Sequence, residues 1–507
     1  KKYSYIQIDK KVNNTANYLK KNSKKKILKI MIHASASIES AVIMLACSKI
    51  GFHFSVIFQE LEELGIRNRI RLFKPDIFFT RLSKYKFTKI MHHKNQPKIK
   101  YIYNKQIKKI INLKKNSRQI ANKVNTSYQS LFTLFTSGST GAPKGIVHTT
   151  GGYLLYAKLT CEKQFGMNKN SIVLTASDAG WINGHTYSLF GPLSFGATTI
   201  LVEKPISLID KNIFEKILDL RASIIYLPVT LIRLIKSLNK NLNIKKKYIN
   251  AIGSMGEPLA PSVAKWFAKN FAKKDTGIVN TYFQTETGGI ICSPRFDENT
   301  KKIPHGSVGR PFSKFIKINS LKEKMLTEIK ITLPWPGMMK NVINGKHEWN
   351  KYWDQSGNFK LFDIATKKNK NIYIHGRNDD VINIRGHRIG SEEVESTILN
   401  LSQITECCAV MLDDYLEGGK IYLFVVSKVN LDNQIEKLII SAFGSYALPK
   451  KIFYVPQIPK TRSGKMLRGL LRNILKKPKS RNYGDISTIL NINNLKEVKK
   501  IIINSYD

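Results

Sequence analysis

Strand-like and helix-like segments alternate along most of this chain, and this alternation restricts the fold more than any other feature. A helix is predicted over residues 38–51, where apolar residues recur at i, i+3, i+4 and i+7 between Ser37, a preferred N-cap, and Gly51. An apolar strand over residues 54–58 follows. The alternation continues with strands over 171–175, 198–203 and 222–227 and a helix over 210–220. Strands separated by such helices predict βαβ units, and therefore an α/β fold with mostly parallel sheets.

The pattern changes near residue 380. A predicted helix over residues 391–401 has Glu392 and Glu393 in its first turn, where they suit the helix dipole. Two strands, over 405–412 and 420–427, and an amphipathic helix around 435–443 follow. Because 507 residues exceed what one hydrophobic core usually serves, we expect two domains. We predict a large N-terminal domain over residues 1–378 and a small α+β C-terminal domain over residues 379–507.

The formal net charge of +47 raises the possibility of a polyanion-binding protein. The lysines are scattered through the whole chain, however, and no RNP-type aromatic motif, zinc-finger spacing or basic zipper accompanies them. We interpret the charge as a compositional bias on solvated faces, and we predict no specific nucleic-acid partner. A basic nucleic-acid-binding protein remains the alternative from another class.

The five cysteines are odd in number and show no C-x-x-C spacing, which excludes an obvious zinc or thioredoxin-type site and gives no disulfide framework. The longest unbroken apolar run near the start, residues 41–47, is far too short to span a bilayer. No secretory signal pattern is visible, although the chain begins with Lys1 and its N-terminus could be incomplete. A cytoplasmic protein without membrane attachment is expected.

The strongest chemical signal is the loop Thr136-Ser137-Gly138-Ser139-Thr140-Gly141-Ala142-Pro143-Lys144-Gly145, which follows an apolar strand over residues 131–135. Glycines let backbone N–H groups approach phosphate oxygens, and the hydroxyl side chains add further donors. The loop is not a Walker A motif, because Pro143 stands where that motif needs glycine. The pattern predicts a phosphate-binding loop of another kind.

The loop resembles the phosphate loop of the adenylate-forming superfamily, and the accompanying motifs resemble its acetyl-CoA and propionyl-CoA synthetase branch. These motifs occur in the family's order at residues 147–153, 179–181, 184–187, 191–193, 256–258, 281–289, 335–337, 376–380, 386–390, 459–465 and 484–488. The resemblance covers nearly the whole chain. It implies a ligase that uses ATP, coenzyme A and Mg²⁺, with a large AMP-binding N-terminal domain of several subdomains and a mobile C-terminal domain.

The resemblance also implies roles for single residues. Lys465 matches the catalytic lysine that neutralises the acid and the α-phosphate, Glu286 matches the Mg²⁺ carboxylate, and Asp363 matches the aspartate that binds both ribose hydroxyls. The residues that match the family's ATP-binding positions are Thr136, Ser137, Gly138, Ser139, Thr140, Gly141, Lys144, Gly256, Glu257, Pro258, Asn280, Thr281, Tyr282, Phe283, Gln284, Thr285, Asp363, Arg377 and Arg388.

The second half-reaction in this family is attack of the CoA thiol on the acyl-adenylate after rotation of the C-terminal domain. Asp379 matches the hinge of that rotation, and Arg385 and Gly386 match positions beside CoA. Gly386 lacks a side chain, which allows the pantetheine thiol to approach. The positions that match the acyl pocket are Trp181, Ile182, Asn183, Met255 and Phe283.

The pocket residues depart from the usual acetyl-CoA synthetase pattern. Phe283 stands where tryptophan is usual, Ile182 is larger than the usual valine, and Asn183 adds a polar group. One methylene changes discrimination by only about 1–3 kcal/mol, so acetate, propionate and other C3 acids, hydroxylated or unsaturated acids among them, all remain open. The stretch over residues 59–114 also diverges, and Arg81 is a candidate contact for the CoA nucleotide there.

Two further expectations concern regulation and completeness. Members of this branch usually begin with an N-terminal segment that has no counterpart here, so an inactive, truncated relative is another alternative. The intact set of Lys465, Asp363 and the two arginines argues against it. The family also makes Lys465 a plausible target of enzymes that acylate and deacylate lysine.

Overall fold

The chain divides into two compact units, each built from several stretches of sequence. The first comprises Lys1–Tyr226, Phe283–Ile291 and Pro334–Tyr352, and the second Leu227–Tyr282, Cys292–Leu333 and Trp353–Asp507. This computed structural model describes residues 1–22, 27–61, 63–91, 99–113, 120, 126–137, 143–238, 242, 244–273, 276–296, 303–321, 323, 325–343, 345–380, 382–384, 387–414, 418–461, 466–480 and 489–505. The predicted domain boundary between residues 378 and 379 stays a prediction.

The centre of the first unit is a seven-stranded sheet with the strand order β15-β6-β5-β2-β1-β3-β4. Strands β1 to β5 run parallel to one another, whereas β6 pairs antiparallel with β5 and β15 antiparallel with β6. The strands are β1 (Lys29–His33), β2 (His53–Ile57), β3 (Ile77–Thr80), β4 (Lys100–Tyr103), β5 (Ser130–Ser137), β6 (Pro143–Thr149) and β15 (Asn341–Val342).

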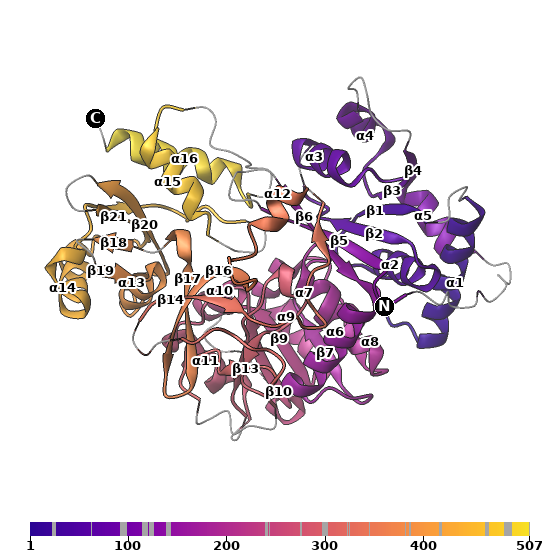
Figure 1. The fold of residues 1–507 in the computed structure, drawn as a ribbon, viewed down its shortest axis with the longest axis horizontal. Coiled ribbons are helices and arrows are strands. Elements are labelled where there is room, and N and C mark those ends of the chain that lie inside the picture. The colour runs from indigo at the N-terminus through magenta and orange to yellow at the C-terminus, as the bar shows by residue number, and fades with distance from the viewer. Residues whose placement is uncertain are drawn as a thin grey trace. The chain divides into compact units, whose positions relative to one another are not determined.

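Helices cover both faces of this sheet, as the alternation of side chains along each strand requires. Ile30 and Ile32 of β1 pack into one apolar core with α1 (Tyr5–Lys21), α2 (Ile38–Ile50) and α5 (Asn104–Ile111). Met31, between them, packs into a second core with α3 (Glu63–Phe73) and α4 (Lys84–Met91). Figure 1 shows α3 and α4 on one side of the sheet and α1 and α2 on the other.

The predicted helix over residues 38–51 is α2, and its ends form as the sequence suggests. The Ser37 hydroxyl accepts a hydrogen bond from the Ser40 N–H at the N-terminus, and Gly51 ends the helix with a φ of 74°, a left-handed conformation that glycine adopts without strain. Further elements of this unit are β7 (Ile172–Thr175), which pairs in parallel with β8 (Thr198–Ile200) and β9 (Ile224–Pro228), and the helices α6 (Thr150–Phe165), α7 (Ile182–His185), α8 (Gly191–Ser194), α9 (Lys211–Leu218) and α12 (Lys346–Asn350).

The second unit contains several smaller sheets. Strand β10 (Ala251–Met255) pairs in parallel with β11 (Ile278–Asn280), beside the helices α10 (Val229–Leu238) and α11 (Pro261–Phe271). An antiparallel sheet has the order β14-β16-β17. The strands of that sheet are β14 (Thr327–Ile331), β16 (Phe359–Lys368) and β17 (Asn371–Arg377). The shorter strands form two pairs, β12 (Cys292–Ser293) with β13 (Arg310–Pro311) and β18 (Ile382–Ile384) with β19 (His387–Ile389).

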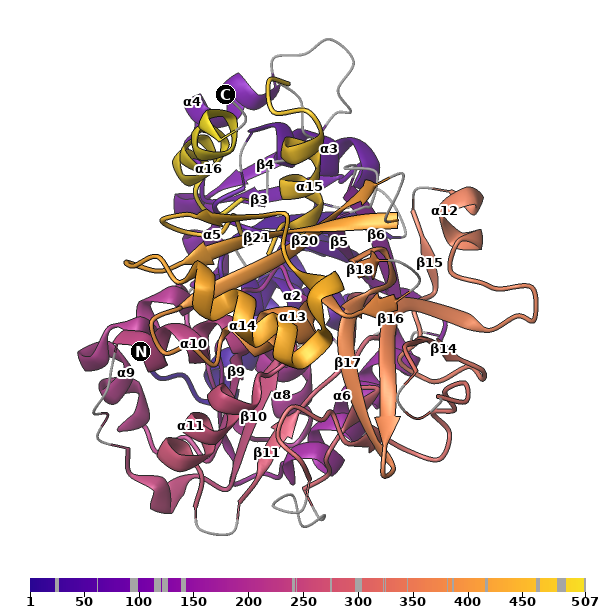
Figure 2. The same cartoon turned by 90° about the vertical axis from the view of Figure 1, so that its left-hand side faces the viewer.

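The last part of the second unit is a three-stranded sheet with helices on both faces. The sheet is formed by β20 (Glu406–Asp414), β21 (Gly418–Val426) and β22 (Lys451–Tyr454). Apolar side chains of α13 (Ser391–Ile398) and α14 (Asp432–Phe443) pack on one face, and those of α15 (Arg468–Lys476) and α16 (Ile492–Asn504) on the other. Figure 2 shows the two pairs of helices on opposite sides of this sheet. The predicted mixed α/β fold is thereby confirmed. No helix within the described residues combines the length and apolarity that crossing a bilayer would need.

Candidate active site

The predicted phosphate loop connects β5 and β6, which form a hairpin at the edge of the parallel sheet. Because β5 runs parallel to β2, its carboxyl end lies at the same edge of the sheet as the carboxyl ends of β1 to β3, where ligands of open α/β sheets bind. In the hairpin Ser137 lies opposite Pro143, and Thr136 lies opposite Lys144. Residues 138–142, with Gly138, Ser139, Thr140 and Gly141 of the prediction, lie outside the described residues.

Lys144 is half of an ion pair at the base of this loop. Its ammonium group lies 3.2 Å from a carboxylate oxygen of Glu348 in α12, and 5.7 Å from the centre of the Tyr352 ring. Hydrogen bonds from Lys351 and then from Lys144 hold the pKa of the Glu348 carboxyl below its ordinary value, against the effect of burial. A negatively charged group therefore already contacts the lysine that the sequence assigns to phosphate.

The segment Thr285–Gly289, which contains Glu286, is fixed by contacts with residues 335–339. The Trp335 indole N–H donates to the Thr287 carbonyl oxygen at 3.0 Å, and the Met339 N–H donates to the Glu286 carbonyl oxygen at 3.0 Å. Gly288 adopts a φ of 71° directly against the backbone of Gly337, so that no larger residue fits. Two motifs that the sequence places far apart thus form one rigid turn that presents Glu286.

His148 supports the same turn from the hairpin side. It is fully buried, and its Nε2 lies 2.7 Å from the Thr285 carbonyl oxygen, to which it donates a hydrogen bond. Burial lowers the pKa of His148 from 6.5 to about 4, although the bond to Thr285 acts in the opposite direction. The imidazole is therefore neutral when the protein is folded at pH 7.

The buried neutral His148 predicts acid lability. A lowered native pKa stabilises the fold fully above pH 6.5, and that contribution is lost as the pH falls through about 4. We expect the loss from His148 between pH 6.5 and 4 to be about 3 kcal/mol. Urea unfolding of His148→Gln, which keeps a donor but does not titrate, should show a shallower decline over this range than the native chain. The control is His347→Gln, the same change at an exposed position. Equal slopes for His148→Gln and the native chain would contradict the prediction.

In the second unit, Asp363 combines with two residues of the predicted ATP-binding set. The Tyr282 hydroxyl donates to one carboxylate oxygen of Asp363 at 2.7 Å, and the Arg377 guanidinium lies 3.6 Å from the other. Asp363 and Arg377 are register partners on β16 and β17, which explains their proximity. Asp363 is only 8% exposed. Burial of Tyr282, and then the charge of Asp363, raise the pKa of Tyr282.

Other predicted ATP-binding residues of the second unit gather around β10 and β11. Asn280 accepts a hydrogen bond from the Ser254 hydroxyl at 2.9 Å, and the Thr281 hydroxyl donates to the Ser254 carbonyl oxygen at 2.7 Å. Glu257 forms an ion pair with Arg233. Gly256, with a φ of 89°, has open space where a side chain would project. The neighbouring Pro258 follows on the same loop.

Four of the five predicted acyl-pocket residues belong to the first unit. The Trp181 ring packs against Phe58 with the centroids 4.8 Å apart, and Phe283 lies edge-on to Tyr187 at 5.7 Å. Ile182 is buried, and the buried Oδ1 of Asn183 has no hydrogen-bond partner among the described residues. The fifth residue, Met255, is buried in the second unit.

The catalytic and CoA predictions fall largely outside the described residues, which exclude Arg385, Gly386 and Lys465. Nothing is described either for the side chains of Ser137, Asp379 and Arg388. Asp380, the next residue after Asp379 in the sequence, forms an ion pair of 2.8 Å with Arg472 of α15. Gln284 and Thr285, two further predicted ATP-binding residues, lie at the start of the turn that contains Glu286.

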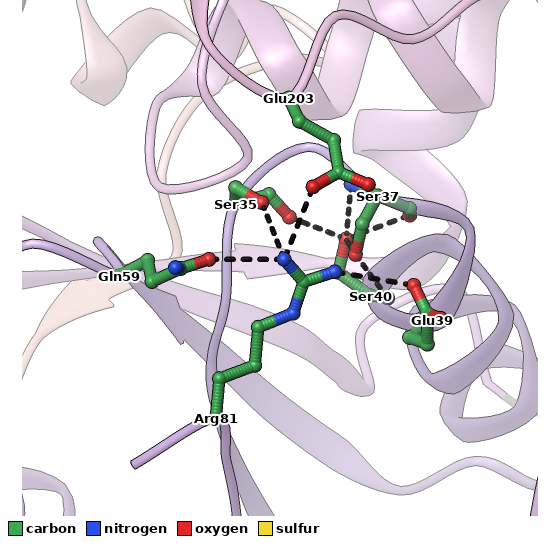
Figure 3. A network of polar contacts seen from close by, with 7 residues as sticks. All are labelled: Ser35, Ser37, Glu39, Ser40, Gln59, Arg81 and Glu203. Carbon is green, nitrogen blue, oxygen red and sulfur yellow. Dashed lines mark hydrogen bonds and ion pairs between the residues drawn. The ribbon is translucent and has the colours of Figure 1, made fainter. Parts of the chain in front are cut away.

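Arg81, a sequence candidate for CoA, is already engaged by two carboxylates. Its guanidinium lies 3.2 Å from Glu39 and 3.1 Å from Glu203, and it donates to the side chain of Gln59 at 3.1 Å and to that of Ser35 at 3.3 Å (Figure 3). Arg81 itself follows β3; Ser35 and Gln59 follow β1 and β2, Glu39 lies in the first turn of α2, and Glu203 follows β8. Arg81 therefore cross-links loops at the carboxyl edge of the sheet, and its charge is balanced without a ligand.

Sequence reasoning missed Glu348 and Tyr352, and it assigned no role to His148. The Tyr352 hydroxyl donates to Glu286 at 2.8 Å, across 66 residues of sequence. A glutamate and a tyrosine in a polar stretch carry no recognisable pattern, so only the fold identifies them. His148 lies within one of the family's motifs, and that placement was a signal for it.

These features define an adenylate-forming enzyme, and comparison with sequence families agrees. Residues 1–326 match the family described as AMP-binding enzyme, and residues 393–465 match the AMP-binding enzyme C-terminal domain. The chain belongs to the AMP-binding enzyme family. The resemblance stated from the motifs is confirmed.

Two relatives with the same name are similar to this chain over nearly its whole length. The chain is 32% identical to "Acetyl-coenzyme A synthetase" of Helicobacter pylori (strain P12), over 98% of this chain and 82% of that protein. It is also 32% identical to the protein of the same name in Magnetococcus marinus, over 96% of this chain and 82% of that protein.

Solved structures share the fold at low sequence identity. An anthranilate CoA ligase, AuaEII, in complex with anthranoyl-AMP superimposes with a TM-score of 0.82 at 18% identity, over 92% of this chain and 90% of that one. Acetoacetyl-CoA synthetase from Streptomyces lividans gives a TM-score of 0.82 at 17% identity, over 99% of this chain and 81% of that one.

Proposed function

We propose that this chain is an AMP-forming short-chain acyl-CoA synthetase. It converts acetate or a similar C2–C3 acid, with ATP and CoA, to acyl-CoA, AMP and pyrophosphate through an acyl-adenylate. The observation that carries the proposal is the pairing, within one unit, of the phosphate-loop lysine Lys144 with a turn that presents Glu286, both contacted by residues 348–352. The cation of Lys144 and the carboxylate of Glu286, held by the same stretch of chain, suit a metal-bound triphosphate.

The chemistry requires two anions to meet, because the acid carboxylate attacks the α-phosphorus of ATP. Lys465 would offset their repulsion during this step, and Asp363 would accept hydrogen bonds from both ribose hydroxyls. The C-terminal domain, residues 379–507, would then turn about Asp379, so that Gly386 admits the CoA thiol. A cytoplasmic location and acylation of Lys465 as a control of activity belong to the same proposal.

Glu286 fits a Mg²⁺ ion. Its Oε1 accepts the Tyr352 hydroxyl, and within the described residues Oε2 has no hydrogen-bond or ion-pair partner. Mg²⁺ is commonly held by one or two carboxylates together with substrate phosphates, which is consistent with the absence of any cluster of three or more His, Cys, Asp or Glu side chains in the described parts of the chain. When bound, the ion would neutralise charge on the phosphates.

For the identity of the acid substrate, Asn183 favours a hydroxylated C3 acid as a second candidate. Its buried, unpartnered Oδ1 could accept a hydrogen bond from a hydroxylated C3 acid, whereas acetate and propionate offer no donor in their alkyl groups. An acid with a suitably placed hydroxyl would satisfy this oxygen.

A panel of C2–C4 acids, hydroxylated and unsaturated acids included, tests the proposal. Each acid is incubated with ATP, CoA and Mg²⁺, and AMP and acyl-CoA are followed. We expect AMP and acyl-CoA in equal amounts with at least one C2–C3 acid. Absence of AMP with every acid would remove the enzyme, and strong, salt-sensitive DNA retention in its place would favour the nucleic-acid-binding alternative.

A further inference from the structure

Tyr352 holds the carboxylate of Glu286 by a single hydrogen bond. The hydroxyl donates to Oε1 at 2.8 Å, and the Tyr352 side chain is buried. The bond fixes one oxygen of the carboxylate and directs the rotation of the other. A hydrogen bond to a ligating carboxylate orients it and improves metal binding.

Tyr352 is itself held by the phosphate hairpin. The Lys144 ammonium lies 5.7 Å from the centre of its ring, within the range of a cation–π contact. The same ammonium pairs with Glu348 at 3.2 Å, and Lys351 pairs with Glu348 at 2.5 Å. Glu348 and Tyr352 lie four residues apart, and Lys144 contacts both of them. These two contacts hold residues 348–352 next to the phosphate hairpin.

The backbone explains why this stretch reaches both groups. We call residues 337–343 and 345–352 the brace segment. Near its start, the Met339 N–H donates to the carbonyl oxygen of Glu286, the proposed metal ligand. It then runs as β15 beside β6, with Val342 opposite Ile146, and continues into α12 next to Lys144. One segment thus contacts the carboxylate and the lysine together.

We propose that Tyr352 is a positioning residue for the metal-binding carboxylate of Glu286, with the brace segment anchored by the Glu348–Lys144 ion pair. The proposal rests on the proposed function, because it assumes that Glu286 binds the metal of the ATP complex. Tyr352 acts through Glu286 and touches no reacting atom. Its loss therefore weakens metal binding while nucleotide contacts that need no metal persist.

The test is Tyr352→Phe in the full chain, which keeps the ring against Lys144 and removes only the hydroxyl. Mn²⁺ binding is titrated by electron paramagnetic resonance in the presence of α,β-methylene-ATP. We expect Mn²⁺ affinity to fall about 10–100-fold, as for other partners of metal ligands. Affinity for the nucleotide without metal should be unchanged, and excess Mn²⁺ should restore binding.

Tyr454→Phe is the matched control, because the Tyr454 hydroxyl also donates to a carboxylate, that of Asp432, at 2.8 Å, and neither residue belongs to the predicted site. It should bind Mn²⁺ as the native chain does. Native affinity in Tyr352→Phe would overturn the inference, as would an equal loss in both variants. A native chain that binds no nucleotide at all would instead overturn the proposed function.

Discussion

Replacement of Lys465 by alanine should abolish adenylate formation while thioester formation from supplied acyl-adenylate continues. In the proposed mechanism the lysine would neutralise the acid and the α-phosphate only during the first half-reaction. Removal of one group that stabilises transition-state charge costs about 10²–10³-fold in rate, and a full charge facing two anions lies at or beyond the top of that range. ATP–pyrophosphate exchange measures the first step, and release of AMP from acetyl-AMP and CoA measures the second.

The control for this prediction is Lys479→Ala, which removes an exposed lysine from the same region of the chain. Both half-reactions of that variant should proceed at native rates. Equal loss of the two half-reactions in Lys465→Ala would contradict the assigned role, because a general defect of folding or nucleotide binding would then explain the result.

Local signals predicted the elements well. The helix over residues 38–51 was predictable from apolar spacing, an N-cap serine and a terminal glycine, and α2 has these same caps. The helix predicted over 210–220 is α9, capped by Asp210. Where boundaries differ, as for β8, which ends at Ile200 rather than 203, tertiary pairing decides how far a strand extends.

Contacts between distant residues could not be predicted in the same way. The motifs placed Glu286 and Lys144 in the site, but the Tyr352 and Glu348 partners depend on how β15 pairs with β6. Arg81 is a second example. The sequence suggested a CoA contact for it, which stays a prediction, and only the fold shows that Glu39 and Glu203 pair with it.

Glu395 is a further residue that the sequence did not single out, and it is part of a buried ion pair. Its side chain is 4% exposed and accepts hydrogen bonds from Arg468 at 2.6 and 3.1 Å and from the Ala409 N–H at 2.7 Å. Arg468 also contacts Glu392 at 2.7 Å. Since Arg468 begins α15, three residues after Lys465 in the sequence, this pair anchors the helix that follows the proposed catalytic residue.

Replacement of Arg468 by methionine should therefore destabilise the protein strongly. The aliphatic length is kept, but Glu395 is left as a buried carboxylate without its cation, and breaking a buried pair in this way costs about 3–5 kcal/mol. Urea unfolding measures the loss. Lys476→Met, on the same helix, is the control, because the Lys476–Asp413 pair is 47% and 77% exposed and should contribute about 1 kcal/mol or less.

The pH dependence of this loss separates charge from packing. Burial raises the pKa of Glu395, and the neighbouring Arg468 acts to lower it. A raised native pKa makes stability fall as the pH rises from the unfolded value through the native one. Without Arg468 the native pKa is higher still, so the gap between Arg468→Met and the native chain should widen as the pH rises. Glu395→Gln in the Arg468→Met background should close most of the gap and remove its pH dependence. A pH-independent loss that Glu395→Gln leaves unchanged would show that Arg468 stabilises α15 by packing alone.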